Sequence, residues 1–194
     1  IRKNKYAAAT RCPDLACAEK MEEAIVNARK AGDSLGGIIE CLALNMPVGV
    51  GEPLFDSLDA DLAKALFAVP AVKGVEFGAG FRAAQLRGSE NNDPFLMTNG
   101  KVATSTDNAG GILGGLSNGM PILIRVAIKP TPSIAKEQKT VNLSKMENAA
   151  LNIKGRHDPC VVPKAVPAVE AAVAITLADH MIRAGFIPKV LKEQ

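Results

Sequence analysis

The feature of this sequence that most constrains its fold is the order in which helical and extended segments follow one another. Apolar residues recur at helical spacing in three segments, 14–31, 55–69 and 163–184. The segments between them carry strand patterns and hairpin signals, and the two kinds of segment do not alternate regularly. A parallel, doubly wound sheet requires regular alternation. We therefore expect an α+β fold in which an antiparallel sheet packs against long helices, with residues 1–194 forming a single domain.

Turn residues bound the expected elements. Pro13 and Asp14 mark the start of the first helix. Residues 95–107 surround Asn99 and Gly100, a dipeptide typical of the type I′ turn of a β-hairpin. The other segments that we expect to be strands are 38–44, 72–77, 121–128, 139–143 and 149–153.

The composition excludes several classes of partner. The net charge of +3 is too small to indicate a nucleic-acid surface, and one tyrosine, six phenylalanines and no tryptophan leave few rings to stack on bases. No uninterrupted apolar run reaches the roughly 18 residues that span a bilayer. We expect no signal peptide. The four cysteines form no CxxC pair, which indicates reduced thiols. We expect a cytoplasmic protein with no nucleic-acid or membrane partner.

The histidines give no metal site. His157 and Cys160 could be imagined as zinc ligands, but the chain has only two histidines and no second ligand pair at metal spacing. We therefore expect no bound metal. The other histidine, His180, lies in the last expected helix, where we expect it to be an ordinary residue of the helix surface.

Two polar turns flank the expected hairpin of 139–143 and 149–153. The first, 129–134, is a stiff proline turn with one cation and two hydroxyls. The second, 154–160, holds a guanidinium, which grips phosphate or an enolate in a fixed fork, and a carboxylate two residues later on the same side of an extended chain. Together they indicate a single anion site. Either turn alone would instead indicate a proline-bounded turn with solvated charges.

The glycine-rich segments leave alternatives open. Five glycines in 108–119 indicate either that backbone approaches a flat ligand closely or that two elements pack closely. Residues 78–83 match GxGxxA after a strand, which would indicate a nicotinamide cofactor. A polar loop follows, however, where a dinucleotide-binding unit needs a helix and a second strand. The pattern therefore carries little weight.

Several motifs, in one order and over nearly the whole chain, resemble the C-terminal half of the chorismate synthase family: Gly49–Pro53, Asp59–Asp61, Arg87–Ser89, Asn108–Gly115, Lys129–Ile134 and Gly155–Cys160. The resemblance implies half of a β-α-β sandwich, two antiparallel sheets around long helices, in a homotetramer. It implies a carbon–oxygen lyase of the shikimate pathway, which makes the precursor of the aromatic amino acids. Such an enzyme removes phosphate from 5-enolpyruvylshikimate 3-phosphate by anti-1,4-elimination, gives chorismate and requires reduced FMN.

The resemblance also assigns roles to individual residues. Pro70 and Ala71 would touch the flavin through their backbone, and Gly114 would pass close to the isoalloxazine or its side chain. The remaining expected FMN contacts, with the cation and the hydroxyls near the ribityl phosphate, are Lys129, Pro130, Thr131, Pro132 and Ser133.

The last two assigned residues would act on the substrate. Arg156 would contact both the flavin and the substrate anion. Asp158 would lie near flavin N5, bind substrate and act in catalysis by helping to receive the departing proton.

The chain departs from the family in what it lacks. Family members carry an N-terminal half with a Gly-Glu-Ser-His-Gly motif, substrate-binding arginines and two catalytic histidines, and neither His157 nor His180 replaces that pair. The chain also begins with Ile1. We therefore expect a fragment that lacks the N-terminal half and is inactive alone. The alternative is a non-catalytic flavin- or anion-binding oligomerisation module, and an upstream Gly-Glu-Ser-His-Gly segment in the gene would decide between them.

Overall fold

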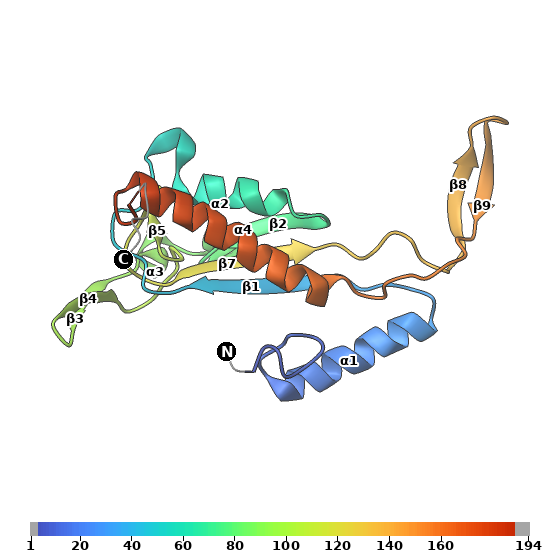
Figure 1. The fold of residues 1–194 in the computed structure, drawn as a ribbon, viewed down its shortest axis with the longest axis horizontal. Helices are drawn as coiled ribbons and strands as arrows, with labels where there is room; N and C mark the ends of the chain where they lie inside the picture. The colour runs from blue at the N-terminus through green and yellow to red at the C-terminus, as the bar shows by residue number, and fades with distance from the viewer. Residues whose placement is uncertain (1–3, 189–194) are drawn as a thin grey trace. The chain divides into compact units, whose positions relative to one another are not determined.

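The structure is a computed structural model that describes residues 4–188 (Figure 1). Its contacts divide the chain into two units, and each is described by itself. The first unit combines Ile1–Ile38 with Ile128–Val166, and the second combines Ile39–Ala127 with Pro167–Gln194. The expectation of a single domain stays a prediction.

A three-stranded sheet forms the centre of the second unit, in the order β1-β7-β2. Its strands are β1 (Gly37–Ala43), β7 (Ile122–Ile128) and β2 (Val72–Phe77). The backbone N–H of Gly78 donates to the carbonyl of Leu123 at 3.1 Å, so the end of β2 lies beside the start of β7. A Cβ on Gly36 would collide with the carbonyl of Ile128, so the start of β1 lies beside the end of β7. The predicted antiparallel sheet is confirmed.

One face of this sheet and two helices supply the core. Strand β7 alternates, and its buried residues are Ile122, Ile124, Val126 and Ile128, the period of two that a half-buried strand shows. Helix α2 (Leu58–Phe67), which contacts β2, buries Leu58, Leu62 and Leu66. Helix α4 (Val162–Arg183) buries Val169, Val173 and Leu177. Each fully buried aliphatic side chain contributes about 1.5–3 kcal/mol to folding. The predicted helices 55–69 and 163–184 are confirmed, although a 3-10 turn (Leu54–Asp56) replaces the start of the former.

Helix α4 is also the one described helix long and apolar enough to cross a membrane, with 22 residues and a mean hydropathy of 1.4. The search of the sequence for uninterrupted apolar runs did not find this helix, because Lys164, Glu170 and Asp179 interrupt its apolar residues. The core helix of a soluble protein passes the same test, so length and composition alone do not place α4 in a bilayer.

The first unit consists of a helix, a hairpin and the turns between them. Helix α1 (Leu15–Lys30) begins where Pro13 and Asp14 predicted, because the Asp14 carboxylate accepts the backbone N–H of Cys17 at 3.1 Å and caps the helix. Strands β8 (Gln138–Asn142) and β9 (Glu147–Leu151) pair antiparallel. Both elements were predicted, with ends that differ by one or two residues.

The remaining elements of the second unit are short. Strands β3 (Phe95–Thr98) and β4 (Lys101–Thr104) form the predicted hairpin, and Asn99 and Gly100 have φ values of 51° and 73°, as a type I′ turn requires. Strands β5 (Ile112–Leu113) and β6 (Leu116–Ser117) form a second hairpin inside the glycine-rich segment, which the sequence did not predict.

The segment after β2 shows whether its glycines belong to a nicotinamide-binding motif or to closely packed backbone. Residues 80–85 form a 3-10 turn and 88–91 a single helical turn α3, so the helix of a dinucleotide-binding unit does not follow. A Cβ on Gly110 would collide with the backbone of Gly78. Close packing of two backbones therefore explains Gly78 and Gly110.

His180 corrects an expectation, because it is buried rather than on the helix surface. Its side chain is 1% exposed. The ring Nε2 lies 3.0 Å from Oδ2 of Asp61 and 2.9 Å from the guanidinium of Arg183, which in turn lies 3.1 Å from Asp61. The buried stripe of α4 thus ends in a polar cluster that ties α4 to α2.

Removing the carboxylate of this cluster is expected to destabilise the fold. Asp61→Ala leaves the buried His180 without its acceptor, and we expect a loss of about 1–3 kcal/mol in the free energy of unfolding. Urea unfolding measures it as a lower midpoint at constant m-value. Asp179→Ala is the matched control, since it removes only the exposed carboxylate 3.1 Å from the same Arg183 and should cost about 0.5 kcal/mol or less.

The loss of unfolding free energy in Asp61→Ala should become smaller as the pH falls. Burial acts to raise the pKa of Asp61, but hydrogen bonds from Arg183 and His180 outweigh it and leave the pKa lowered. A lowered pKa stabilises the fold above the ordinary aspartate range near pH 4 and ceases to do so as the pH falls through the folded-state pKa. The gap between the wild type and Asp61→Ala should therefore shrink in acid. An equal cost for both variants at neutral pH would contradict this role of the cluster.

Candidate functional site

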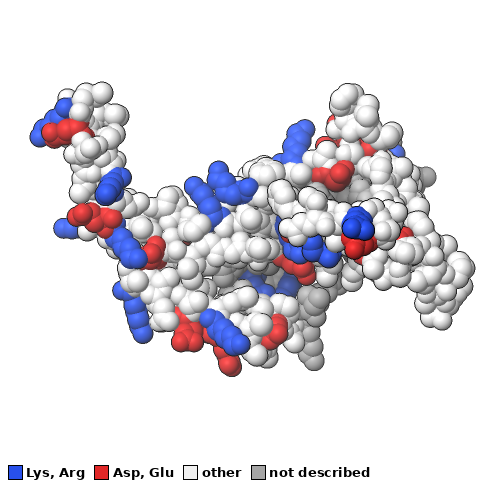
Figure 2. All heavy atoms as spheres, turned by 180° about the vertical axis from the view of Figure 1, so that it is seen from behind, with Lys and Arg blue, Asp and Glu red and all other residues white. Residues whose placement is uncertain are grey.

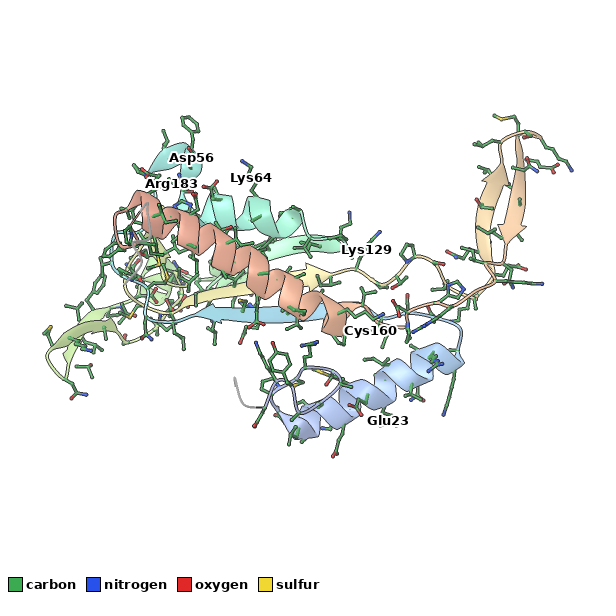
Figure 3. The ribbon with its side chains drawn as sticks, viewed as in Figure 1. Glu23, Asp56, Lys64, Lys129, Cys160 and Arg183 are labelled. Atoms are coloured by element: carbon green, nitrogen blue, oxygen red, sulfur yellow. The ribbon has the colours of Figure 1, made fainter. Side chains whose placement is uncertain are left out.

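The structure brings the two predicted polar turns together within the first unit. Residues 34–35 join them, since the hydroxyl of Ser34 donates to the carbonyl of Thr131 at 2.7 Å and the N–H of Leu35 donates to the carbonyl of Pro159 at 2.7 Å. Leu35 also forms a parallel bridge with Cys160. We call residues 129–133 with 156–158 the anion cluster. It lies between the end of β7, where Figure 3 labels Lys129, and the start of α4, where it labels Cys160.

A direct contact links the turns. The hydroxyl of Ser133 lies 2.9 Å from Nδ1 of His157, and Nε2 of the same ring lies 3.1 Å from the carbonyl oxygen of Ile153. Both ring nitrogens are therefore engaged within the protein. Among residues 4–188, no group of three His, Cys, Asp or Glu side chains could hold a metal ion.

Asp158 is held by a lysine. Nζ of Lys164, in the first turn of α4, lies 2.7 Å from each oxygen of the Asp158 carboxylate. The hydrogen bond from Lys164 lowers the pKa of Asp158, burial opposes it, and the charges of Lys164 and Arg156 lower it further. The carboxylate is consequently ionised at neutral pH. Its hydrogen-bond partner is Lys164 and not Arg156.

The rest of the anion cluster has the donors that a phosphate group needs. The side chains of Lys129 and Arg156 are exposed. The hydroxyl oxygen of Thr131 is buried with no hydrogen-bond partner in the described part of the chain. On the face shown in Figure 2, basic and acidic side chains are interspersed, and that face carries no broad surface of one charge.

The three other predicted flavin contacts lie in the second unit. Pro70 and Ala71 form the turn between α2 and β2, and Ala71 has a φ of 71°, an unfavourable value for a residue with a Cβ. Such strain is concentrated at functional turns. Gly114 has a φ of 59°, and a Cβ there would meet nothing within 4 Å. Close packing thus explains Gly110 but not Gly114, where the space that a Cβ would occupy is open.

The profile of a known family, described as chorismate synthase, matches residues 1–182. The chain belongs to the chorismate synthase family. It is 58% identical over 193 residues to the chorismate synthase of Dehalococcoides mccartyi strain BAV1, covering 100% of this chain and 53% of that protein. It is 57% identical over 194 residues to that of Methanosarcina barkeri, with the same two coverages.

A solved structure described as a crystal structure of chorismate synthase has the same fold. It superposes with a TM-score of 0.76 at 32% identity, covering 94% of this chain and 47% of that one. The α+β fold class and the family resemblance are therefore confirmed. The chain spans about half the length of the chorismate synthases that it matches.

Three residues that contact the two polar turns were not found from the sequence. Lys164 follows Asp158 by six residues and lies in the first turn of the helix that was predicted to start at Pro163. Because Asp158 comes just before that helix, the sequence could have suggested an ion pair between the two residues. No local signal marks Ser34 and Leu35. Ser34 is 97 residues from its partner Thr131. Leu35 is farther still from its partner Pro159.

Proposed function

We propose that the full-length protein, meaning the entire product of the gene that encodes this chain, is a chorismate synthase. It would convert 5-enolpyruvylshikimate 3-phosphate to chorismate by anti-1,4-elimination of phosphate, with reduced FMN, in the cytoplasm and as a homotetramer. Membership of the family supports the reaction class. The observation that carries the proposal is the anion cluster, in which a turn with a cation and two hydroxyls meets a second cationic turn through Ser133 and His157.

The residues of the cluster fit a phosphate-bearing flavin. Thr131 has a buried hydroxyl oxygen without a partner, and a phosphate oxygen would supply one. Lys129 and Arg156 would balance the negative charge, since guanidinium–phosphate hydrogen bonds are short and charge-assisted. When bound, reduced flavin supplies the electron density that lets the allylic C–O bond break without net redox change.

The chain's own residues would supply orientation, positive charge and a base. Arg156 would hold the substrate anion and stabilise charge on the departing phosphate. Asp158, ionised because Lys164 lowers its pKa, would accept the proton that leaves the substrate. Lys164 contacts both carboxylate oxygens and would fix the orientation of that base.

Removing the guanidinium tests this assignment through binding. In the full-length protein, Arg156→Ala is expected to raise the Kd for 5-enolpyruvylshikimate 3-phosphate about 10- to 100-fold, because a hydrogen bond to a charged group contributes about 1.5–3 kcal/mol. Isothermal titration measures the Kd for substrate and for FMN. Lys73→Ala, which removes an exposed cation on β2, is the control and should leave both constants unchanged. Equal Kd values for wild type and Arg156→Ala would remove Arg156 from the site.

The second candidate is a non-catalytic flavin- or anion-binding module that oligomerises. The β8–β9 hairpin favours it, because the apolar side chains at its end are exposed, Leu143 at 77% and Met146 at 83%. The complete gene discriminates between the two candidates. A natural product of this length that binds FMN and releases no phosphate would support the module.

A further inference from the structure

His157 has one ring nitrogen whose proton is fixed by its partner. Nε2 lies 3.1 Å from the carbonyl oxygen of Ile153, and a carbonyl can only accept. Nε2 therefore carries a hydrogen in the neutral ring and in the cation alike. Nδ1, 2.9 Å from the hydroxyl of Ser133, is the nitrogen that gains or loses a proton.

The proton on Nδ1 decides what Ser133 can offer to a ligand. When Nδ1 is unprotonated, it can only accept, so the hydroxyl hydrogen of Ser133 points to it and the serine oxygen presents lone pairs elsewhere. When Nδ1 is protonated, it donates to the serine oxygen, and the hydroxyl hydrogen is released. A phosphate dianion has only acceptor oxygens. It is therefore repelled by the first arrangement and bound by the second.

We propose that His157 is a positioning residue that sets the direction of the Ser133 hydroxyl, and that the anion cluster binds a phosphate-bearing ligand together with one proton taken up at Nδ1. The identity of that ligand as FMN rests on the proposed function. The coupling itself rests on the three groups Ile153, His157 and Ser133, which the geometry connects in a single chain of hydrogen bonds.

The two turns that hold the ring also carry several charged side chains. Lys129 comes from the first turn, Lys154 and Arg156 from the second, and Lys136 forms an ion pair with Asp33 at 2.7 Å. Asp158, the carboxylate next to His157, is already bound by Lys164 of α4. A bound phosphate dianion would bring negative charge to this site, and a nearby negative charge favours the protonated form of a histidine.

Histidine is also the side-chain type whose charge changes between about pH 5 and 8. Lysine and arginine side chains in general keep their charge in that range, and the lowered pKa of Asp158 keeps its carboxylate ionised. Cys160 is the remaining titratable side chain of the second turn. Proton uptake near neutral pH therefore points to His157, and a Cys160→Ser variant controls for the thiol.

Calorimetry on the full-length protein tests the proposal. FMN is titrated near pH 7.5, where its phosphate is already a dianion because the second phosphate pKa is about 6. Two buffers of different ionisation enthalpy give the number of protons taken up. We expect both wild type and Cys160→Ser to take up close to one proton per FMN bound. Above the pH range in which histidine loses its proton, the wild-type Kd for FMN should rise about tenfold per pH unit.

The variants and a second ligand separate the coupling from other causes. His157→Asn keeps an amide at the position of Nδ1 but does not titrate, so proton uptake should vanish and the Kd should lose its pH dependence. Ser133→Ala should bind FMN more weakly and take up much less than one proton. Riboflavin, which lacks the phosphate, should bind wild type without proton uptake.

Three kinds of result would overturn the inference, and they can be distinguished. FMN binding without proton uptake, or with equal uptake in wild type and His157→Asn, would refute the coupling and leave the proposed function standing. Absence of FMN binding to the wild type would refute both the coupling and the flavin-dependent function. Full uptake in Ser133→Ala would show that His157 meets the phosphate directly and that Ser133 does not relay its charge.

Discussion

The 194-residue chain purified alone is expected to form no detectable chorismate from 5-enolpyruvylshikimate 3-phosphate and reduced FMN. The chain covers 53% of the Dehalococcoides mccartyi chorismate synthase, and the family resemblance places two catalytic histidines and several substrate-binding arginines in the other half. A general acid–base group contributes about 10²–10⁴-fold to a rate. Loss of two such groups together with substrate-binding cations would place turnover below detection. Chorismate is measured by chromatography under anaerobic conditions.

Adding the half of the relatives that this chain does not span is the decisive control. The chain mixed with a separately produced N-terminal half of a chorismate synthase is expected to regain measurable turnover, because family members hold both halves in one protein. Circular dichroism and FMN titration on the chain alone show whether it is folded and binds flavin. Chorismate formation by the chain alone would mean that residues within it supply the acid–base chemistry assigned to the other half.

Local periodicity explains how much of this fold the sequence predicted. Strand β2 occupies the predicted residues 72–77, and the stripe Val169, Val173 and Leu177 on α4 repeats every four residues. These elements are recognisable because each buries one face, and the face recurs within a few residues of the same segment. The hairpin at Asn99 and Gly100 was predicted for a comparable reason, since both residues adopt positive φ readily.

Contacts between distant segments explain what the sequence missed. His180 is buried because its ring nitrogen finds Asp61, a partner 119 residues earlier, and nothing within α4 indicates that partner. The β5–β6 hairpin is only two residues per strand, which is too short for an alternating pattern. Its position depends on a hydrogen bond from the N–H of Leu58 to the carbonyl of Gly115 at 3.0 Å.

The sequence predicted which residue types gather in the two polar turns, but not all of the contacts between them. The motifs placed a cation in each turn and two hydroxyls in the first turn, and the turns do meet. The pairing of Asp158 with Lys164 rather than Arg156 required knowledge of where α4 begins relative to the turn. That pairing matters for the remaining prediction, because it sets the charge state and the orientation of the carboxylate.

Asp158→Asn in the full-length protein is expected to lower kcat about 10²–10⁴-fold, the usual contribution of an acid–base group, while the Kd values for FMN and substrate change by a small factor. Asparagine keeps the size of aspartate and an oxygen that accepts the Lys164 hydrogen bond, but it cannot take up a proton near neutral pH. If Asp158 only stabilised the turn, the loss would appear in stability or in Kd. Steady-state kinetics at saturating substrate and calorimetric titration separate these outcomes.

Two further variants separate proton transfer from ion pairing. Asp33→Asn is the matched control, because Asp33 is also bonded to a lysine, Lys136, at 2.7 Å and has its pKa lowered mainly by that bond. It should leave kcat unchanged. Lys164→Met removes the main cause of the low pKa of Asp158, so that pKa should rise and the acidic limb of the pH–rate profile should move to higher pH. A near-wild-type kcat for Asp158→Asn, or an acidic limb that stays in place in Lys164→Met, would show that another group receives the proton.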